Sequence, residues 1–159
     1  MTSGAALEEV VAEVVAAEQV ARVVLSADPE VEGLAAHLRT LGVEVLGGRA
    51  PQDAARADLG ITGACFGLAA TGSVAVAAGR AGGRSASLLP PVHLAVVAAS
   101  RVVASASEVW RRIPEHFPDG LPSQLVFISG PSRSADIEFT LTVGVHGPKR
   151  VWLALLDDR

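Results

Sequence analysis

The sequence is poor in the residues that mark several common classes of protein. It has one cysteine, Cys65, no tyrosine, and only 4% aromatic residues among its 159 positions. A single thiol forms no internal disulfide, and it cannot by itself hold a structural zinc ion or an iron–sulfur cluster. A lone thiol agrees with a reducing compartment, so we expect a cytoplasmic protein.

Long apolar runs and basic clusters are also scarce. Four glutamates interrupt the first apolar residues, namely Glu8, Glu9, Glu13 and Glu18, so we expect neither a signal peptide nor a membrane-spanning helix there. The chain carries 13 basic and 17 acidic residues, a net charge of -4. No basic stripe is interleaved with aromatic residues, so nucleic acid is not an expected partner.

The short motifs of the common enzyme classes are missing. No G-x-G-x-x-G follows a strand, and neither a G-x-x-x-x-G-K-[ST] nor a G-x-S-x-G motif occurs. The four histidines are scattered, and none stands at metal-ligand spacing from another histidine or the cysteine. We therefore expect no bound metal or cofactor, and we assign no catalytic residue.

What the chain does have is aliphatic residues, because half of its positions are hydrophobic. The length of residues 1–159 fits one domain with a single core. Aliphatic strand-like runs alternate with helical patterns, which is typical of α/β layer folds. We predict a mainly parallel central sheet of about five or more strands with helices on both faces.

The opening of the chain predicts a helix–strand–helix–strand unit. Its elements are a helix over Ala5–Gln19, a strand over Ala21–Ser26, a helix over Val31–Leu41 ended by Gly42, and a strand over Val43–Leu46. Such a unit implies two parallel strands joined by a crossover helix.

The later elements follow from apolar runs and from punctuation by glycine and proline. We predict strands over Ser73–Ala78, His93–Ala99, Val102–Ala104, Gln124–Ser129 (buried) and Val151–Leu156, a Gly-rich turn over Arg80–Arg84, and an extended link over Leu88–Pro91. A helix capped by Ser105 or Ser107 should run to about Phe117, kinked or ended early by Pro114. The pattern of Ser134–Val145 fits both a helix face and a strand alternation, and we assign a helix because glycine and proline flank it.

The segment Ser129–Glu138 is the first candidate site. It follows a predicted strand and opens the predicted helix, where unpaired amides attract anions. We expect its backbone amides and polar side chains to receive a carboxylate or phosphate; the residues chosen are Gly130, Ser132, Arg133, Ser134 and Asp136. The alternative is ordinary helix capping by serine and aspartate.

The segment Gly60–Ser73 is the second candidate, because its glycines let the backbone approach a ligand closely. The residues chosen from it are Thr62, Gly63, Thr71, Gly72 and Ser73. The alternative is that the glycines only form turns between short strands. Cys65 is expected to be a small buried hydrophobic residue, and His93 and the segment Gly144–Arg150 to be structural.

Taken together, several segments resemble one family. Gly60–Ala64, Ala69–Ser73, Ser87–His93, Ser129–Glu138 and Gly144–Pro148 occur in an order and spacing similar to those of the LUD-domain family of lactate utilisation protein C. The resemblance begins at about Asp58. It implies a fold like that of the NagB/RpiA/CoA-transferase group. It also implies a role beside two iron–sulfur partner proteins that oxidise L-lactate to pyruvate.

One departure from the family pattern bears on catalysis. Ala70 stands where the family usually has glutamate, so the carboxylate that could act as acid or base is absent. The resemblance therefore favours an accessory, non-redox subunit. The alternatives are an enzyme or binding protein for a small phosphorylated or CoA-linked ligand, and a structural interaction module. A homo-oligomer is also left open.

Overall fold

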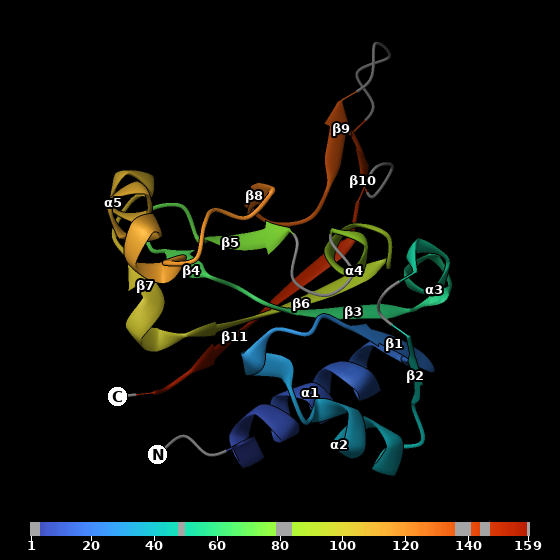
Figure 1. Cartoon of the computed structure of the whole chain (residues 1–159). Helices are drawn as coiled ribbons and strands as arrows, with labels where there is room; N and C mark the ends of the chain where they lie inside the picture. The colour runs from blue at the N-terminus through green and yellow to red at the C-terminus, as the bar shows by residue number, and fades with distance from the viewer. Residues whose placement is uncertain (1–3, 48–49, 79–83, 136–140, 144–146, 159) are drawn as a thin grey trace.

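The centre of the molecule is a five-stranded, all-parallel sheet, in the strand order β11-β6-β3-β1-β2 (Figure 1). The computed structural model describes residues 4–47, 50–78, 84–135, 141–143 and 147–158. The strands are β1 (Arg22–Leu25), β2 (Glu44–Leu46), β3 (Leu59–Gly63), β6 (Val92–Ala98) and β11 (Arg150–Leu156). The predicted mainly parallel sheet is confirmed.

Helices cover both faces of this sheet. Because successive side chains of a strand point to opposite faces, neighbouring residues of β1 enter different clusters. Val23 packs into the main core with residues of α1 (Gly4–Glu18) and α2 (Leu34–Thr40). Val24 packs on the other face against α3 (Pro51–Arg56) and α4 (Ser85–Leu88). The fold is therefore layered, as the aliphatic pattern predicts.

A second, smaller sheet packs on the face that bears α3 and α4 (Figure 1). Its strands are β4 (Phe66–Leu68), β5 (Ser73–Ala78), β7 (Val102–Val103) and β8 (Gln124–Ile128), in the order β7-β4-β5-β8. Val74 and Val76 of β5 pack against Ala95 and Val97 of β6. The opposite face of the small sheet packs against α5 (Ala106–His116).

Two helices differ from the sequence prediction in instructive ways. The helix expected over Val31–Leu41 is divided into η1 (Pro29–Val31) and α2, because Gly33 between them is left-handed with φ 92°. The helix α5 runs through Pro114 to His116 instead of ending early. Pro114 lies in the last turn, where only one helical hydrogen bond is lost. The short helix α3 was not predicted.

The helix predicted over Ser134–Val145 is wrong in the part that the structure describes. There the chain forms β9 (Arg133–Ala135) and β10 (Leu141–Val143), which pair antiparallel with Ala135 opposite Leu141. The strand alternation in the sequence was therefore the correct signal. Residues 136–140 and 144–146 lie outside the described part of the chain.

Two smaller predictions also need correction. Leu88 is not extended but ends α4, and Leu89 keeps helical angles (φ -87°, ψ -40°) although proline follows it. The strand β8 is not fully buried, because it is an edge strand of the small sheet and Phe127 is 36% exposed. Most of the predicted turn over Arg80–Arg84 lies outside the described residues.

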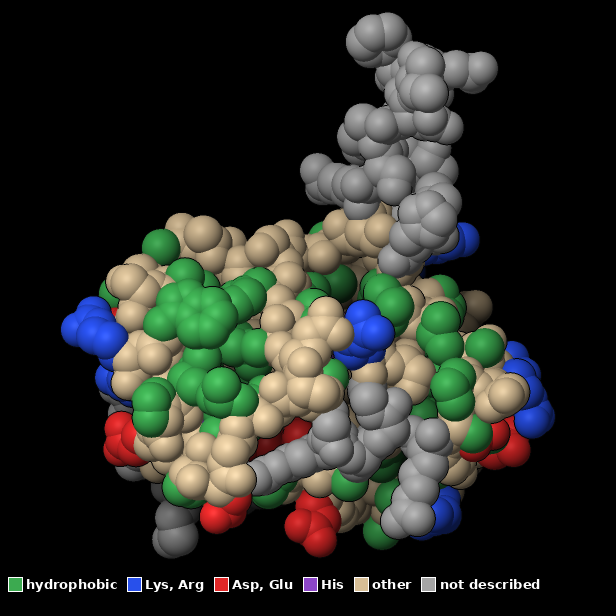
Figure 2. Space-filling view, turned by 45° about the horizontal axis from the view of Figure 1, so that its top comes forward, with side chains coloured by type: hydrophobic (Ala, Val, Ile, Leu, Met, Phe, Trp, Pro, Cys, Tyr) green, Lys and Arg blue, Asp and Glu red, His purple; other side chains and the backbone are tan. Residues whose placement is uncertain are grey.

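An apolar patch lies on the surface where α5 meets β8. Figure 2 shows hydrophobic side chains gathered there, and the rings of Trp110 and Phe127 lie 6.3 Å apart between centroids. Within the described residues, each helix is too short or too polar to cross a lipid bilayer.

Candidate functional site

Polar side chains gather at the carboxyl edge of the parallel sheet. Ser26 and Asp28 follow β1, Cys65 follows β3, and Arg101 follows β6 in the short helix η2 (Ala99–Arg101). The carboxyl ends of parallel strands meet at one edge, and open α/β sheets bind their ligands there.

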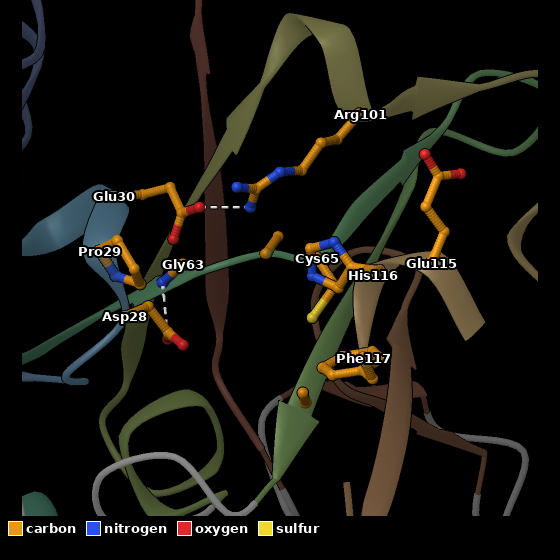
Figure 3. Close-up of a pocket in the computed structure, with 11 residues that line it drawn as sticks. Asp28, Pro29, Glu30, Gly63, Cys65, Arg101, Glu115, His116 and Phe117 are labelled. Carbon is orange, nitrogen blue, oxygen red and sulfur yellow. Dashed lines mark hydrogen bonds and ion pairs between the residues drawn. The ribbon is translucent and has the colours of Figure 1, made fainter. Parts of the chain in front are cut away.

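Asp28, Cys65 and Arg101 line a cleft of about 300 Å³ that we call the carboxyl-edge cleft (Figure 3). The sheet side and η1 provide one wall, and the end of α5 provides the opposite wall. Its side chains include Asp28, Glu30, Cys65, Arg101, Glu115, His116 and Phe117. Because one wall rests on the main core and the other on the small sheet, the cleft lies between two separately packed parts of the domain.

Gly63 allows the backbone of β3 to pack closely against Asp28 and Glu30 in the first wall. Its backbone N–H donates to Oδ2 of Asp28 at 3.1 Å and to Oγ of Ser26 at 3.3 Å. The Ser26 hydroxyl itself donates to Asp28 at 2.5 Å. A Cβ atom at Gly63 would lie 2.5 Å from atoms of Asp28 and Glu30, so only glycine fits.

An ion pair in the cleft lining joins η1 to η2. The guanidinium of Arg101 donates to the carboxylate of Glu30, whose side chain is only 9% exposed (Figure 3). This pair fixes the position of the only guanidinium that the described residues bring to the lining. Three carboxylates, of Asp28, Glu30 and Glu115, share the described lining with this one guanidinium, so the cleft offers mostly hydrogen-bond acceptors.

Cys65 and His116 complete the cleft. Burial raises the pKa of the Cys65 thiol to about 11, so at neutral pH it is the uncharged thiol and not a nucleophilic thiolate. The ring of His116 contacts Phe66 and Phe117, with centroids 5.0 and 4.6 Å apart. The described residues contain no group of three or more His, Cys, Asp or Glu side chains placed to hold a metal ion.

The predicted site residues of the second segment separate in the structure. Gly63 lines the cleft. Thr62 is instead buried in the protein interior, where its Oγ1 lies 2.9 Å from Nε2 of His93. Burial lowers the pKa of His93 to about 4, so this imidazole is neutral. Thr71 and Gly72 are exposed, and Gly72 has φ 62° as a turn glycine.

A chain of hydroxyls joins the second candidate segment to the first. Oγ1 of Thr71 lies 2.7 Å from Oγ of Ser73, which lies 2.7 Å from Oγ of Ser129. Ser129 leads into Gly130 and Ser132. The structure thus brings together residues 56 positions apart that the sequence analysis had assigned to separate sites.

The Ser129–Ser132 segment lines a groove of about 280 Å³ that we call the hydroxyl groove. Its described polar lining comes from Arg84, Ser87, Gln124, Ser129 and Ser132, and its apolar lining includes Leu88, Val126, Phe127, Ile128 and Pro148. Arg84 is the only charged residue in the described lining. Ser132 is held there by its N–H, which donates to the carbonyl of Pro148 at 2.9 Å.

In the described residues, a strand stands where the anion-site prediction placed a helix N-terminus. Gly130, with φ 100°, leads into the strand β9 that contains Arg133 and Ser134, and no described helix begins there. Asp136 lies outside the described residues. The groove thus keeps Gly130 and Ser132 from the predicted set and adds Arg84.

Several cleft residues were missed by sequence analysis. Asp28, Glu30 and Arg101 belong to no short motif, and Arg101 meets Glu30 across 71 positions. Their position just after predicted strands was the available signal, because side chains after parallel strands share one edge.

The fold and the cleft define an α/β protein whose candidate site lies where open parallel sheets bind ligands. The chain belongs to the LUD domain family, which matches residues 1–156. This confirms the family resemblance found in the sequence.

Curated relatives agree with this assignment. "Lactate utilization protein C" of Halalkalibacterium halodurans is 44% identical over 133 residues, which cover 80% of this chain and 58% of that protein. The protein of the same name from Shouchella clausii is 43% identical over 70% of this chain and 49% of its own length. That of Anoxybacillus flavithermus is 34% identical over 99% of this chain and 73% of its own length. The chain thus spans about half the length of the first two relatives.

A solved structure shares the fold. The crystal structure of a DUF162 family protein from Deinococcus radiodurans superposes with a TM-score of 0.53, at 21% identity, over 96% of this chain and 98% of that chain.

Proposed function

We propose that this chain serves lactate utilisation as a non-redox subunit, acting with iron–sulfur partner proteins that oxidise L-lactate to pyruvate. The observation that carries the proposal is the similarity to proteins named "lactate utilization protein C", one of which aligns over 99% of this chain. In this proposal residues 1–159 act as one LUD-type domain in the cytoplasm.

The chemistry of the reaction supports a division of labour. Oxidation of the lactate C–OH to the C=O of pyruvate releases two electrons and two protons, and another group must accept the electrons. Iron–sulfur clusters are held by several cysteine thiolates, whereas this chain has one cysteine, buried as a thiol. We therefore assign electron transfer to the partners.

The test is reconstitution with defined components. The isolated chain, given L-lactate and an artificial electron acceptor, should show no turnover, and adding cluster-bearing partner proteins should produce pyruvate. The matched control is the same partners without this chain, which should be slower. Turnover by the isolated chain, or an equal rate without it, would overturn the accessory role.

A specific observation favours a second candidate, a protein that binds a small phosphorylated or CoA-linked ligand. Arg84 lines the hydroxyl groove together with Ser87, Ser132 and several apolar side chains. A guanidinium binds phosphate or carboxylate through charged hydrogen bonds, and the apolar side chains would accept the rest of the ligand.

Calorimetric titration separates the two candidates. Inorganic phosphate, coenzyme A and L-lactate are added to the chain as separate probes. Binding of phosphate or coenzyme A supports the second candidate, whereas binding of L-lactate alone supports the lactate role.

A further inference from the structure

The strand β11 is an open edge of the central sheet. It bonds to β6 through a seven-residue register from Arg150 to Leu156, and the sheet order gives it no neighbour on its other side among the described residues. An edge strand presents a row of unpaired N–H and C=O groups, which can pair with another strand.

The two edges of the central sheet differ in how well they are protected against pairing with a further strand. The opposite edge, β2, has three residues and begins at the exposed Glu44. Such shortness and charge discourage pairing. By contrast, Val151–Leu156 contains no charge, proline or glycine.

The face of β11 adds apolar surface to this edge. Trp152, Ala154 and Leu156 pack into the main core beside α1. The alternate side chains of Leu153 and Leu155 are 47% and 56% exposed. The strand is therefore apolar on both faces, although only one of them is covered.

Opposite charges flank the apolar segment. Arg150 precedes it, with its side chain 66% exposed despite an ion pair with Glu18, and Asp157 and Asp158 follow it, both exposed. Asp158 accepts hydrogen bonds from the N–H and hydroxyl of Ser100, at 2.9 and 2.5 Å, which hold the end of the strand in place.

From this juxtaposition we propose that β11 pairs antiparallel with β11 of a second copy of this chain, and joins the two central sheets into one. A two-fold axis at Ala154 places Arg150 of each copy opposite Asp158 of the other, and the exposed Leu153 opposite the exposed Leu155, so that paired side chains lie on the same face of the joined sheet. A parallel pairing would place like charges together, which is unfavourable. A two-fold interface is self-complementary in this way because the same patch serves both subunits.

The test is the oligomeric state of the full chain, measured by sedimentation at micromolar concentrations. We expect a dimer. The Leu155→Lys variant should raise the dimer dissociation constant at least about tenfold, because the lysine opposes edge pairing. Leu121→Lys is the matched control: Leu121 is 72% exposed in a loop, and its replacement should leave the constant unchanged.

A charge exchange tests the register. Arg150→Glu and Asp158→Lys should each weaken the dimer, and the double variant should restore it, because the opposite charges again face each other. Circular dichroism checks that each variant is folded. A wild-type monomer, equal behaviour of the two lysine variants, or a double variant weaker than both singles would overturn the proposal.

Discussion

The hydroxyl of Thr62 lies 2.9 Å from Nε2 of His93, between two parallel strands and away from solvent. The imidazole is fully buried, and no described residue bonds to its Nδ1. Because burial lowers the pKa of His93 from 6.5 to about 4, the folded protein holds this ring neutral.

This burial predicts a loss of stability in acid. Below pH 6.5 the unfolded chain binds a proton at His93, whereas the folded protein does not until about pH 4. Stability from this group is therefore complete above pH 6.5 and falls as the pH decreases through that window, by up to roughly 3 kcal/mol. Urea unfolding at a series of pH values measures it. A His93→Gln variant should show a smaller slope, and an identical slope would contradict the assignment.

The glycine at position 60 should be indispensable. A Cβ atom there would lie 1.7 Å from the carbonyl oxygen of Ala86 in α4, a backbone atom that cannot move alone. Gly60→Ala should cost about 3 kcal/mol or more in the free energy of unfolding. Gly67→Ala is the matched control, because its nearest neighbour is a side-chain atom of Val102 at 3.3 Å. Equal losses in the two variants, measured by urea unfolding, would refute the close contact.

The Glu30–Arg101 pair should contribute more than the surface pair of α5. Arg101→Gln leaves the buried Glu30 carboxylate without its partner, and we expect a loss of about 1–3 kcal/mol, moderated because the Arg101 side chain is 34% exposed. Arg112→Gln breaks the exposed pair with Glu108 and should cost no more than about 0.5 kcal/mol. The double variant Glu30→Gln, Arg101→Gln should lose less than the sum of its singles. Additive losses would show that the two side chains do not interact.

The hydroxyl groove predicts which arginine binds an anion. Arg84→Gln should weaken binding of the anionic probe found by titration by roughly 1.5–3 kcal/mol, because a charged hydrogen bond is lost. Arg133→Gln tests the arginine chosen from the sequence, whose backbone belongs to β9. Calorimetry on both variants gives the answer. A larger effect at Arg133 would move the anion site to β9.

The sequence predicts the central sheet well because its signals are local. Apolar runs such as Val92–Ala98 have neighbours on both faces of the sheet, so nearly every side chain in them is aliphatic. Gly42 likewise marks the end of α2, because glycine readily adopts the left-handed angle, φ 77°, that ends a helix.

The candidate sites were less predictable because they depend on distant contacts. Glu30 meets Arg101 across 71 positions, and Ser73 meets Ser129 across 56. No spacing rule covers such pairs. Ile137, Leu141 and Val145 satisfied a helical period as well as a strand period, and only the pairing of β9 with β10 decides between them.

The position of the carboxyl-edge cleft has a consequence for how its affinity can evolve. One wall is supported by Val31 in the main core, and the other by Ile113 and Phe117 in the core beneath α5. A change of side-chain volume at these buried positions would widen or narrow the opening while leaving every polar group in it unaltered. Two relatives with identical charged residues in the cleft would thus differ in the size of the molecule they accept, because of differences in their buried apolar residues alone.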